Sequence, residues 1–268
     1  MSKAKIFWSG SILITLCISA FFGMKILKGH EVPGEPFSQR MQRYYFRIFK
    51  PGATYIYLHR AYYQFHVPQK GVIHIGARCG EELDFYEALG VKDLLWIEAD
   101  LDIETQLKKN VAKHPGSRVA MFAAGDHSGK IQLHRTSNEG HSSSILKLKE
   151  HKKYYPGITE VDSMDVPMKR LDDYLKEEDN RDFNAIVIDI QGAELIALRG
   201  AVETLKKIDA IITEINYDEL YEGGVFIQDL DQFLSKQGFT RVDTISGGHY
   251  TGDALYIRNE FFKGDKKS

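Results

Sequence analysis

The stretch Val72-Ile73-His74-Ile75-Gly76-Ala77-Arg78-Cys79-Gly80-Glu81-Glu82 decides the fold. It begins as an apolar run, turns at a G-x-x-x-G motif and continues into a helical pattern. A strand that passes into a helix through a glycine turn is typical of the first unit of a doubly wound α/β sheet. A second apolar run follows and ends at Glu98. The stretch therefore predicts an α/β fold with a mostly parallel sheet.

The same residues predict a nucleoside-containing cofactor. Gly76 and Gly80 allow the backbone to come close to a ligand, and Glu98 is placed to accept hydrogen bonds from a ribose hydroxyl pair. Glu81 and Glu82 stand in the first turn of the helix, where they would repel the pyrophosphate of NAD. S-adenosyl-L-methionine carries a sulfonium and an ammonium and no phosphate. The local charge therefore favours S-adenosyl-L-methionine over NAD.

Composition narrows the class of protein. The 268 residues are 43% apolar and 27% charged, as in an ordinary globular protein. The formal net charge of −2 gives no support to a nucleic-acid surface, so we expect no nucleic-acid partner. The two cysteines, Cys17 and Cys79, do not form a disulfide framework.

An apolar segment at the N-terminus predicts a membrane anchor. Residues 6–24 contain no charged side chain and would span roughly 28 Å as a helix. We expect an uncleaved anchor over 6–27 and a single-pass membrane protein. A cleaved signal peptide with Ala20 before the cleavage point is the alternative. The flanking lysines and arginines favour a cytosolic main domain, and a lumenal one stays open.

Two later strands end in acidic residues. The apolar run Ala185-Ile186-Val187-Ile188 stops at Asp189, and residues 210–216 repeat the pattern with Glu214 and Asn216. Ligands of open α/β sheets bind beyond the carboxyl ends of strands. A polar loop over 136–144 lies between these strands and the first unit, and either closes over a substrate or is an ordinary surface loop.

Three blocks of sequence resemble a known family. They are Ile73 to Glu82 with Trp96-Ile97-Glu98-Ala99, Ile188-Asp189-Ile190-Gln191-Gly192-Ala193-Glu194-Leu195 with Leu198-Arg199-Gly200-Ala201, and Glu214-Ile215 with Asp229-Leu230 and Gly238-Phe239. Over about residues 71–259 the chain resembles the FkbM-type S-adenosylmethionine-dependent methyltransferases. The resemblance implies a class I methyltransferase (Rossmann-like) fold with a seven-stranded, mostly parallel sheet. It also implies methyl transfer, generally to oxygen.

The resemblance assigns the cofactor site by position. The expected cofactor-binding residues are His74, Gly76, Ala77, Gly80, Glu98, Ala99, Ala124 and Asp126. The sequence departs from the family twice: His74 replaces the usual acidic residue before the first glycine, and Val187 replaces a frequent lysine. Glu81 or Asp189 is then the candidate for holding the methionine ammonium.

Transfer to a hydroxyl requires a base that removes its proton. The predicted catalytic residues are Asp189, Glu194 and Glu214, with His127 or His141 as further candidates if the polar loop folds inward. Capping a helix is the alternative role for Asp189, and stabilising a first turn is the alternative for Glu194. Asp189, Glu214 and Asn216 at adjacent strand ends are an alternative divalent-ion site with oxygen ligands, but no metal ligand is predicted.

The expected organisation is a short tail (1–5), the anchor (6–27), a linker and stem (28–70), a methyltransferase domain (71–259) and a disordered tail (260–268). The leading function is a membrane-anchored methyltransferase that O-methylates a small-molecule or glycan hydroxyl. A non-catalytic adaptor or trafficking protein at a membrane is the alternative. A nucleotide-dependent oxidoreductase is disfavoured by Glu81 and Glu82. Nothing in the sequence predicts an oligomeric state.

Overall fold

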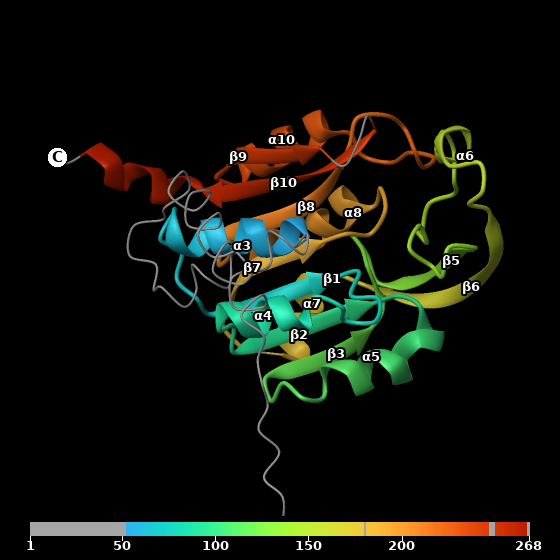
Figure 1. Cartoon of the computed structure of the whole chain (residues 1–268), viewed down its shortest axis with the longest axis horizontal. Helices are drawn as coiled ribbons and strands as arrows, with labels where there is room; N and C mark the ends of the chain where they lie inside the picture. The colour runs from blue at the N-terminus through green and yellow to red at the C-terminus, as the bar shows by residue number, and fades with distance from the viewer. Residues whose placement is uncertain (1–51, 180, 247–249, 267–268) are drawn as a thin grey trace, which may run out of the picture. The chain divides into compact units, whose positions relative to one another are not determined.

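A seven-stranded β-sheet forms the centre of the structure (Figure 1). The computed structural model describes residues 52–266, apart from 180 and 247–249. The strand order is β3-β2-β1-β7-β8-β10-β9, and β10 runs antiparallel to both of its neighbours. The strands are β1 (Gly71–Ile75), β2 (Asp93–Glu98), β3 (Ser117–Met121), β7 (Phe183–Ile188), β8 (Ala210–Asn216), β9 (Phe239–Ser246) and β10 (Thr251–Arg258). The predicted α/β fold with a seven-stranded, mostly parallel sheet is confirmed.

Helices cover both faces of this sheet (Figure 1). On one face α3 packs against α4, β8 and β10, and on the other α7, α8, α9 and α10 pack against one another over the main apolar core. The helices are α3 (Ala53–Tyr63), α4 (Leu83–Leu89), α5 (Glu104–Val111), α6 (His151–Tyr154), α7 (Leu171–Glu177), α8 (Glu194–Arg199), α9 (Val202–Leu205) and α10 (Ile227–Lys236), with 3-10 helices η1 (Leu101–Ile103) and η2 (Asn259–Lys266). Because both faces are covered, β1 and β7 are buried along their whole length, which explains their continuous apolar runs.

The register of the central strands determines where the site lies. Ile75 at the end of β1 is level with Ile97 on β2 and with Ile188 on β7. The residues that follow these positions therefore meet at one edge of the sheet. They are Gly76, Glu98 and Asp189, as the strand-end rule predicts.

A second, three-stranded sheet extends from the first (Figure 1). It consists of β4 (Ala123–Ala124), β6 (Glu160–Lys169) and β5 (Gly129–Thr136), in that order. The sequence predicts one strand over 118–123, but the structure ends β3 at Met121 and begins β4 at Ala123 in the other sheet. Sequence analysis did not predict this second sheet. Alternation along a strand shows that one face is buried and does not show against which sheet.

The helix predicted over 193–205 is interrupted at Gly200, between α8 and α9. The backbone of Gly125 packs against this position and requires glycine, because a Cβ on Gly200 would lie 1.8 Å from the Gly125 carbonyl oxygen. The Gly200 carbonyl accepts a hydrogen bond from the Asp172 amide at 3.0 Å. This glycine therefore brings the α8–α9 turn against the turn that follows β4.

The predicted membrane localisation needs correction. The predicted anchor at 6–27 lies outside the described residues. Within residues 52–266, apart from 180 and 247–249, no helix is long and apolar enough to cross a membrane. The longest helix of that part, α3, has 11 residues and spans about 16 Å, roughly half of a bilayer's hydrocarbon thickness. A single-pass membrane protein is therefore not supported, and the other predicted segment boundaries stay predictions.

Gly200 provides a test of this packing. Gly200→Ala forces a methyl group into the Gly125 backbone and is expected to lower the free energy of unfolding by about 1–3 kcal/mol in urea titrations. Gly157→Ala is the control, because no atom lies within 4 Å of the Cβ position there. It is expected to change stability by less than about 0.5 kcal/mol. Equal stability of the two variants would contradict the close approach.

Candidate active site

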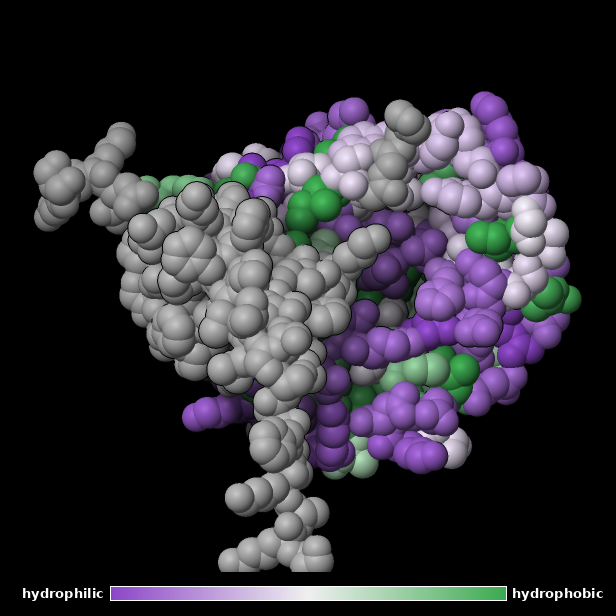
Figure 2. Space-filling view, viewed as in Figure 1, coloured by the Kyte–Doolittle hydropathy of each residue, from purple (hydrophilic) through white to green (hydrophobic). Residues whose placement is uncertain are grey.

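A pocket lies beyond the carboxyl ends of β1, β2 and β7, where the surface is hollowed and mostly hydrophilic (Figure 2). Its lining comes from five segments that are distant in sequence, within 75–82, 97–103, 122–124, 139–145 and 189–193, and from Leu133 on β5. The first, second and fifth follow strand ends of the main sheet. The polar loop is the fourth, so the predicted loop does border the pocket.

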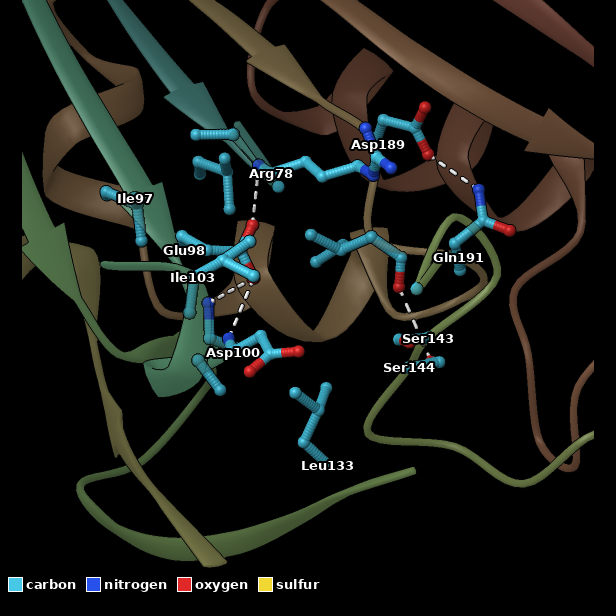
Figure 3. A pocket seen from close by; sticks show the side chains of 18 of the residues that line it. Arg78, Ile97, Glu98, Asp100, Ile103, Leu133, Ser143, Ser144, Asp189 and Gln191 are labelled. Atoms are coloured by element: carbon cyan, nitrogen blue, oxygen red, sulfur yellow. Dashed lines mark hydrogen bonds between the residues drawn. The ribbon is translucent and has the colours of Figure 1, made fainter. Parts of the chain in front are cut away.

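Glu98 is held on the pocket wall by three backbone amides (Figure 3). One carboxylate oxygen accepts a hydrogen bond from the Arg78 amide at 2.7 Å. The other accepts from the Ala99 amide at 2.7 Å and the Asp100 amide at 2.8 Å. Burial raises the pKa of Glu98, and the three amides counteract this rise. The carboxylate is therefore fixed in place and retains acceptor capacity toward the pocket.

The glycine turn is clamped between two strands. The amides of Gly76 and Ala77 both donate to the Ile97 carbonyl, at 2.9 and 3.1 Å. Gly76 has φ +87°, and a Cβ there would lie 1.8 Å from the Asp189 carbonyl oxygen. Glycine is therefore required, and the turn lies directly against the end of β7.

The structure brings most, but not all, of the expected cofactor residues to the pocket. The lining includes Gly76, Ala77, Glu98, Ala99 and Ala124. It does not include His74, Gly80 or Asp126. A Cβ on Gly80 would meet Val111 on α5 at 2.7 Å, so this glycine packs beneath the turn. Asp126 is exposed and pairs with His127, with 2.7 Å between Oδ1 and Nδ1.

His74 is buried on the α4 side of the sheet. Its Nδ1 lies 2.7 Å from the Tyr86 hydroxyl, and its ring stacks on Trp96 with 5.3 Å between centroids. Burial lowers the pKa of His74 to about 4, so the ring is neutral at physiological pH. The residue that replaces the family's usual carboxylate is thus part of an aromatic cluster. Val187, the other departure, is level with His74 inside the sheet and is also buried.

The three predicted catalytic residues lie in different surroundings. Asp189 lines the pocket, and one of its oxygens accepts from Gln191 Nε2 at 2.7 Å (Figure 3). Glu214 is not in the lining, but Gln191 Nε2 also donates to it, at 3.0 Å. Glu194 is fully buried and accepts from the amides of Ile190 and Gly192, at 3.2 and 3.1 Å. The structure therefore joins Asp189 to Glu214, and Glu194 holds the turn after β7.

Burial alters the acidity of all three groups. It raises the pKa of Asp189 and of Glu214, and it raises the pKa of Glu194 to about 7. The polar loop contributes His141 to the lining, whereas His127 is not in it. That loop is attached at Glu139, whose carbonyl accepts from Arg78 Nη2 at 3.3 Å, and at Ser144, which donates to the Ile190 carbonyl at 3.4 Å.

Sequence reasoning did not assign a role to several residues of the site. They are Arg78, Asp100, Gln191 and Tyr221. Gln191 stands in the most specific block of the family resemblance, which was the available signal for it. Tyr221 lies 30 residues further along the chain, and its hydroxyl donates to Gln191 Oε1 at 2.7 Å. No sequence pattern connects these two residues.

Negative charge dominates the pocket. The lining carboxylates are Glu81, Glu82, Glu98, Asp100, Glu139 and Asp189, against the single lining cation Arg78 among the described residues. Arg78 is itself paired with Glu81. Among the described residues, no group of three or more His, Cys, Asp or Glu side chains is arranged to hold a metal ion. The pocket therefore suits an organic cation better than a pyrophosphate.

The sequence profile of the methyltransferase FkbM domain matches residues 74–241, more than half of the chain. The chain belongs to the methyltransferase FkbM family. The predicted family is thereby confirmed, together with its class I methyltransferase fold. The predicted enzyme class, a methyltransferase that uses S-adenosyl-L-methionine as cofactor, is also confirmed.

Individual proteins show more distant similarity. The FkbM chain is 29% identical over 163 residues to 2-O-methyltransferase NoeI of Sinorhizobium fredii, covering 58% of this chain and 67% of NoeI. The structural match with magnesium protoporphyrin IX methyltransferase (ChlM) from Synechocystis PCC 6803 covers 95% of this chain and 100% of that protein, at 8% identity and a TM-score of 0.44. For Sp1610 of Streptococcus pneumoniae the shares are 73% and 66%, with 14% identity and a TM-score of 0.43. The chain thus spans about two thirds of NoeI and of Sp1610, and such TM-scores say nothing of activity.

The residues of this FkbM pocket fit S-adenosyl-L-methionine. Glu98 offers carboxylate oxygens to a ribose hydroxyl pair. Glu82 and Asp189 also line the pocket, where their negative charge would suit the sulfonium and the ammonium in place of the carboxylate that the family usually has at position 74. No phosphate-binding cation is required.

Glu98 provides the test of the cofactor site. Glu98→Ala is expected to weaken both S-adenosyl-L-methionine and S-adenosylhomocysteine by about tenfold to a hundredfold, because hydrogen bonds to a charged acceptor contribute about 1.5–3 kcal/mol. Isothermal titration calorimetry measures both affinities. Asp102→Asn, an exposed neighbour on η1, is the control and is expected to bind like the wild type. Unchanged affinity in Glu98→Ala would contradict a ribose role.

A second test measures how the free energy of unfolding depends on pH. Burial raises the pKa of Glu82, Glu194 and Asp253 to about 7. At these three groups the folded protein binds more protons than the unfolded chain, so their contribution to the free energy of unfolding falls as the pH rises from about 4 to about 7. Glu194→Gln keeps an acceptor for the two amides and is expected to flatten this fall by about 1–3 kcal/mol.

Urea titrations over a pH series measure the effect, with exposed Glu104→Gln as the control. If Glu194→Gln and Glu104→Gln both retained the wild-type pH dependence, the raised pKa of Glu194 would be disproved.

Proposed function

We propose that this FkbM protein transfers the methyl group of S-adenosyl-L-methionine to a hydroxyl oxygen of a small-molecule or glycan acceptor. One observation carries the proposal. Asp189 lines the acidic pocket, and its backbone lies directly against the glycine turn. A base is therefore located next to the segment that would hold the cofactor. The similarity to NoeI, a 2-O-methyltransferase, supports oxygen as the acceptor atom.

The chemistry divides between cofactor and protein. When bound, S-adenosyl-L-methionine supplies an activated methyl group on a sulfonium. In the proposal, Glu98 holds the ribose, and Glu82 balances the positive charge from the α4 side. The protein's remaining tasks are to align the acceptor hydroxyl and to remove its proton.

Asp189 is the proposed base. Its Oδ1 is bonded to Gln191, and within the described residues Oδ2 forms no hydrogen bond. Oδ2 is therefore the oxygen that would accept the hydroxyl proton as the oxygen–methyl bond forms. Burial raises the pKa of Asp189, which makes the carboxylate a stronger base than one in water. Glu214 and Glu194 act through the network and the turn rather than on the acceptor.

Asp189→Asn tests the proposal. The wild type is incubated with methyl-labelled S-adenosyl-L-methionine and a panel of methyl glycosides and oligosaccharides, and the label is followed by mass spectrometry. Labelling of a hydroxyl is expected, and Asp189→Asn is expected to lower its rate by about a hundredfold to ten-thousandfold while the cofactor still binds.

Asp84→Asn is the control, because this carboxylate is exposed on α4 and pairs with Lys113. Transfer of label to nitrogen or carbon acceptors only, or equal rates in Asp189→Asn and the wild type, would contradict the proposal. Cofactor binding without transfer to any acceptor would favour the adaptor alternative.

A further inference from the structure

Gln191 adopts a conformation that side chains usually avoid. Its φ is +58°, and the following Gly192 has φ +94°. A left-handed conformation costs a residue with a Cβ about 1 kcal/mol or more, so surrounding contacts must hold it. In this conformation the Gln191 side chain lies in the pocket wall, with its amide close to Asp189 (Figure 3).

Tyr221 determines which way the Gln191 amide points. The buried Tyr221 hydroxyl donates to Gln191 Oε1 at 2.7 Å. The hydroxyl also lies 3.2 Å from the Ser142 carbonyl oxygen, so its single proton has two acceptors, of which Gln191 Oε1 is the nearer. With Oε1 facing the hydroxyl, Nε2 faces the opposite side, where it meets two acceptors. Tyr221 is itself fixed, because its ring packs with Leu148 and Leu220 and closely approaches Gly192. The orientation of the amide is therefore imposed by a rigid aromatic residue.

The two acceptors are the carboxylates of Asp189 and Glu214. Gln191 Nε2 lies 2.7 Å from Asp189 Oδ1 and 3.0 Å from Glu214 Oε2. Both protons of one amide nitrogen are thus used to bridge two acids from neighbouring strand ends. This fixes Asp189 in a rotamer that leaves its second oxygen for a ligand in the pocket.

We propose that Gln191, anchored by Tyr221, is a positioning residue that joins Asp189 and Glu214 into one carboxylate pair and keeps the ionised oxygen of Asp189 directed at the reacting groups. The inference rests on the proposed function, in which Asp189 is the base. It adds the residues that aim this base and set its charge.

The electrostatics agree with this geometry. Burial raises the pKa of both acids, and the Gln191 hydrogen bond lowers both again. The other groups that act on Asp189 are Glu82 from α4, His74 from β1 and His141 from the polar loop. Those that act on Glu214 are Glu194 from α8 and Asp253 from β10. Two neighbouring carboxyls that share one donor titrate as a pair, so removing the amide or one acid must displace the remaining titration.

The shift in titration can be measured without a methyl acceptor, as the number of protons released when the cofactor binds. S-adenosyl-L-methionine brings a sulfonium that S-adenosylhomocysteine lacks. A nearby positive charge lowers the pKa of a carboxyl, so binding of the sulfonium compound should release protons wherever the pH lies between the free and bound values. Calorimetry in buffers of different ionisation enthalpy gives the number of protons released at each pH.

Three substitutions are expected to move the pH at which protons are released, two of them upward and one downward. Gln191→Met keeps the length and removes both donors, so proton release should move to higher pH and S-adenosyl-L-methionine should bind about threefold to tenfold more weakly at neutral pH, with recovery at alkaline pH. Tyr221→Phe frees the amide to rotate and should shift the profile the same way, by less. Glu214→Gln removes the neighbouring negative charge and should move proton release to lower pH.

A purely structural role for Gln191 would weaken both ligands equally at every pH. The proposal is overturned if Gln191→Met leaves the proton profile unchanged, or if Gln191→Met and Glu214→Gln displace it in the same direction. Should Gln191→Met not fold, the opposite shifts of Tyr221→Phe and Glu214→Gln decide the question. Failure to methylate any hydroxyl would remove the proposed function and leave these proton measurements valid, so the two failures are distinguishable.

Discussion

The contact between Gly76 and the end of β7 is the constraint on which the site depends. No Cβ fits at Gly76, because it would lie 1.8 Å from the Asp189 carbonyl oxygen. The Asp189 amide completes the contact by donating to the Ile75 carbonyl at 3.0 Å. Since the same glycine also donates to Ile97 on β2, the turn joins three strand ends. The glycine turn and the backbone at Ile97 and Asp189 are therefore placed relative to one another by these contacts.

This compact arrangement concentrates acidic groups where burial disfavours charge. Glu98 is stabilised as an anion by three amides, whereas Glu82 has its pKa raised to about 7 and Asp189 relies chiefly on one amide donor. Such an assembly is electrostatically costly without a counter-charge. A cationic ligand offsets that cost and a pyrophosphate would add to it. The acidity of the pocket is thus the physical reason why this turn matches a sulfonium cofactor rather than a dinucleotide.

The sequence predicted the residues whose place follows from strand order. It did not predict contacts between side chains that are distant in sequence. The rule that ligands bind at strand ends placed Glu98 and Asp189 correctly at the pocket, because parallel strands must end at one edge. It did not show that His74, inside β1, faces Tyr86, since alternation does not reveal which face of a buried strand meets the ligand. Gln191 was missed because its role requires a left-handed φ and a partner 30 residues away.

The two halves of the pocket differ in how they are built. The cofactor half consists of strand ends and their immediate turns, which the parallel sheet holds in register. Beyond Asp189 the pocket is bordered by the polar loop from the second sheet. Tyr221, from the segment after β8, lies behind this wall, and its hydroxyl is within hydrogen-bond distance of Gln191 Oε1 and of the Ser142 carbonyl oxygen. A family resemblance carried by strand ends therefore predicts the cofactor well. In the proposed function the acceptor would contact the polar loop beside Asp189, so its identity is to be sought in the side chains of that loop rather than in the fold.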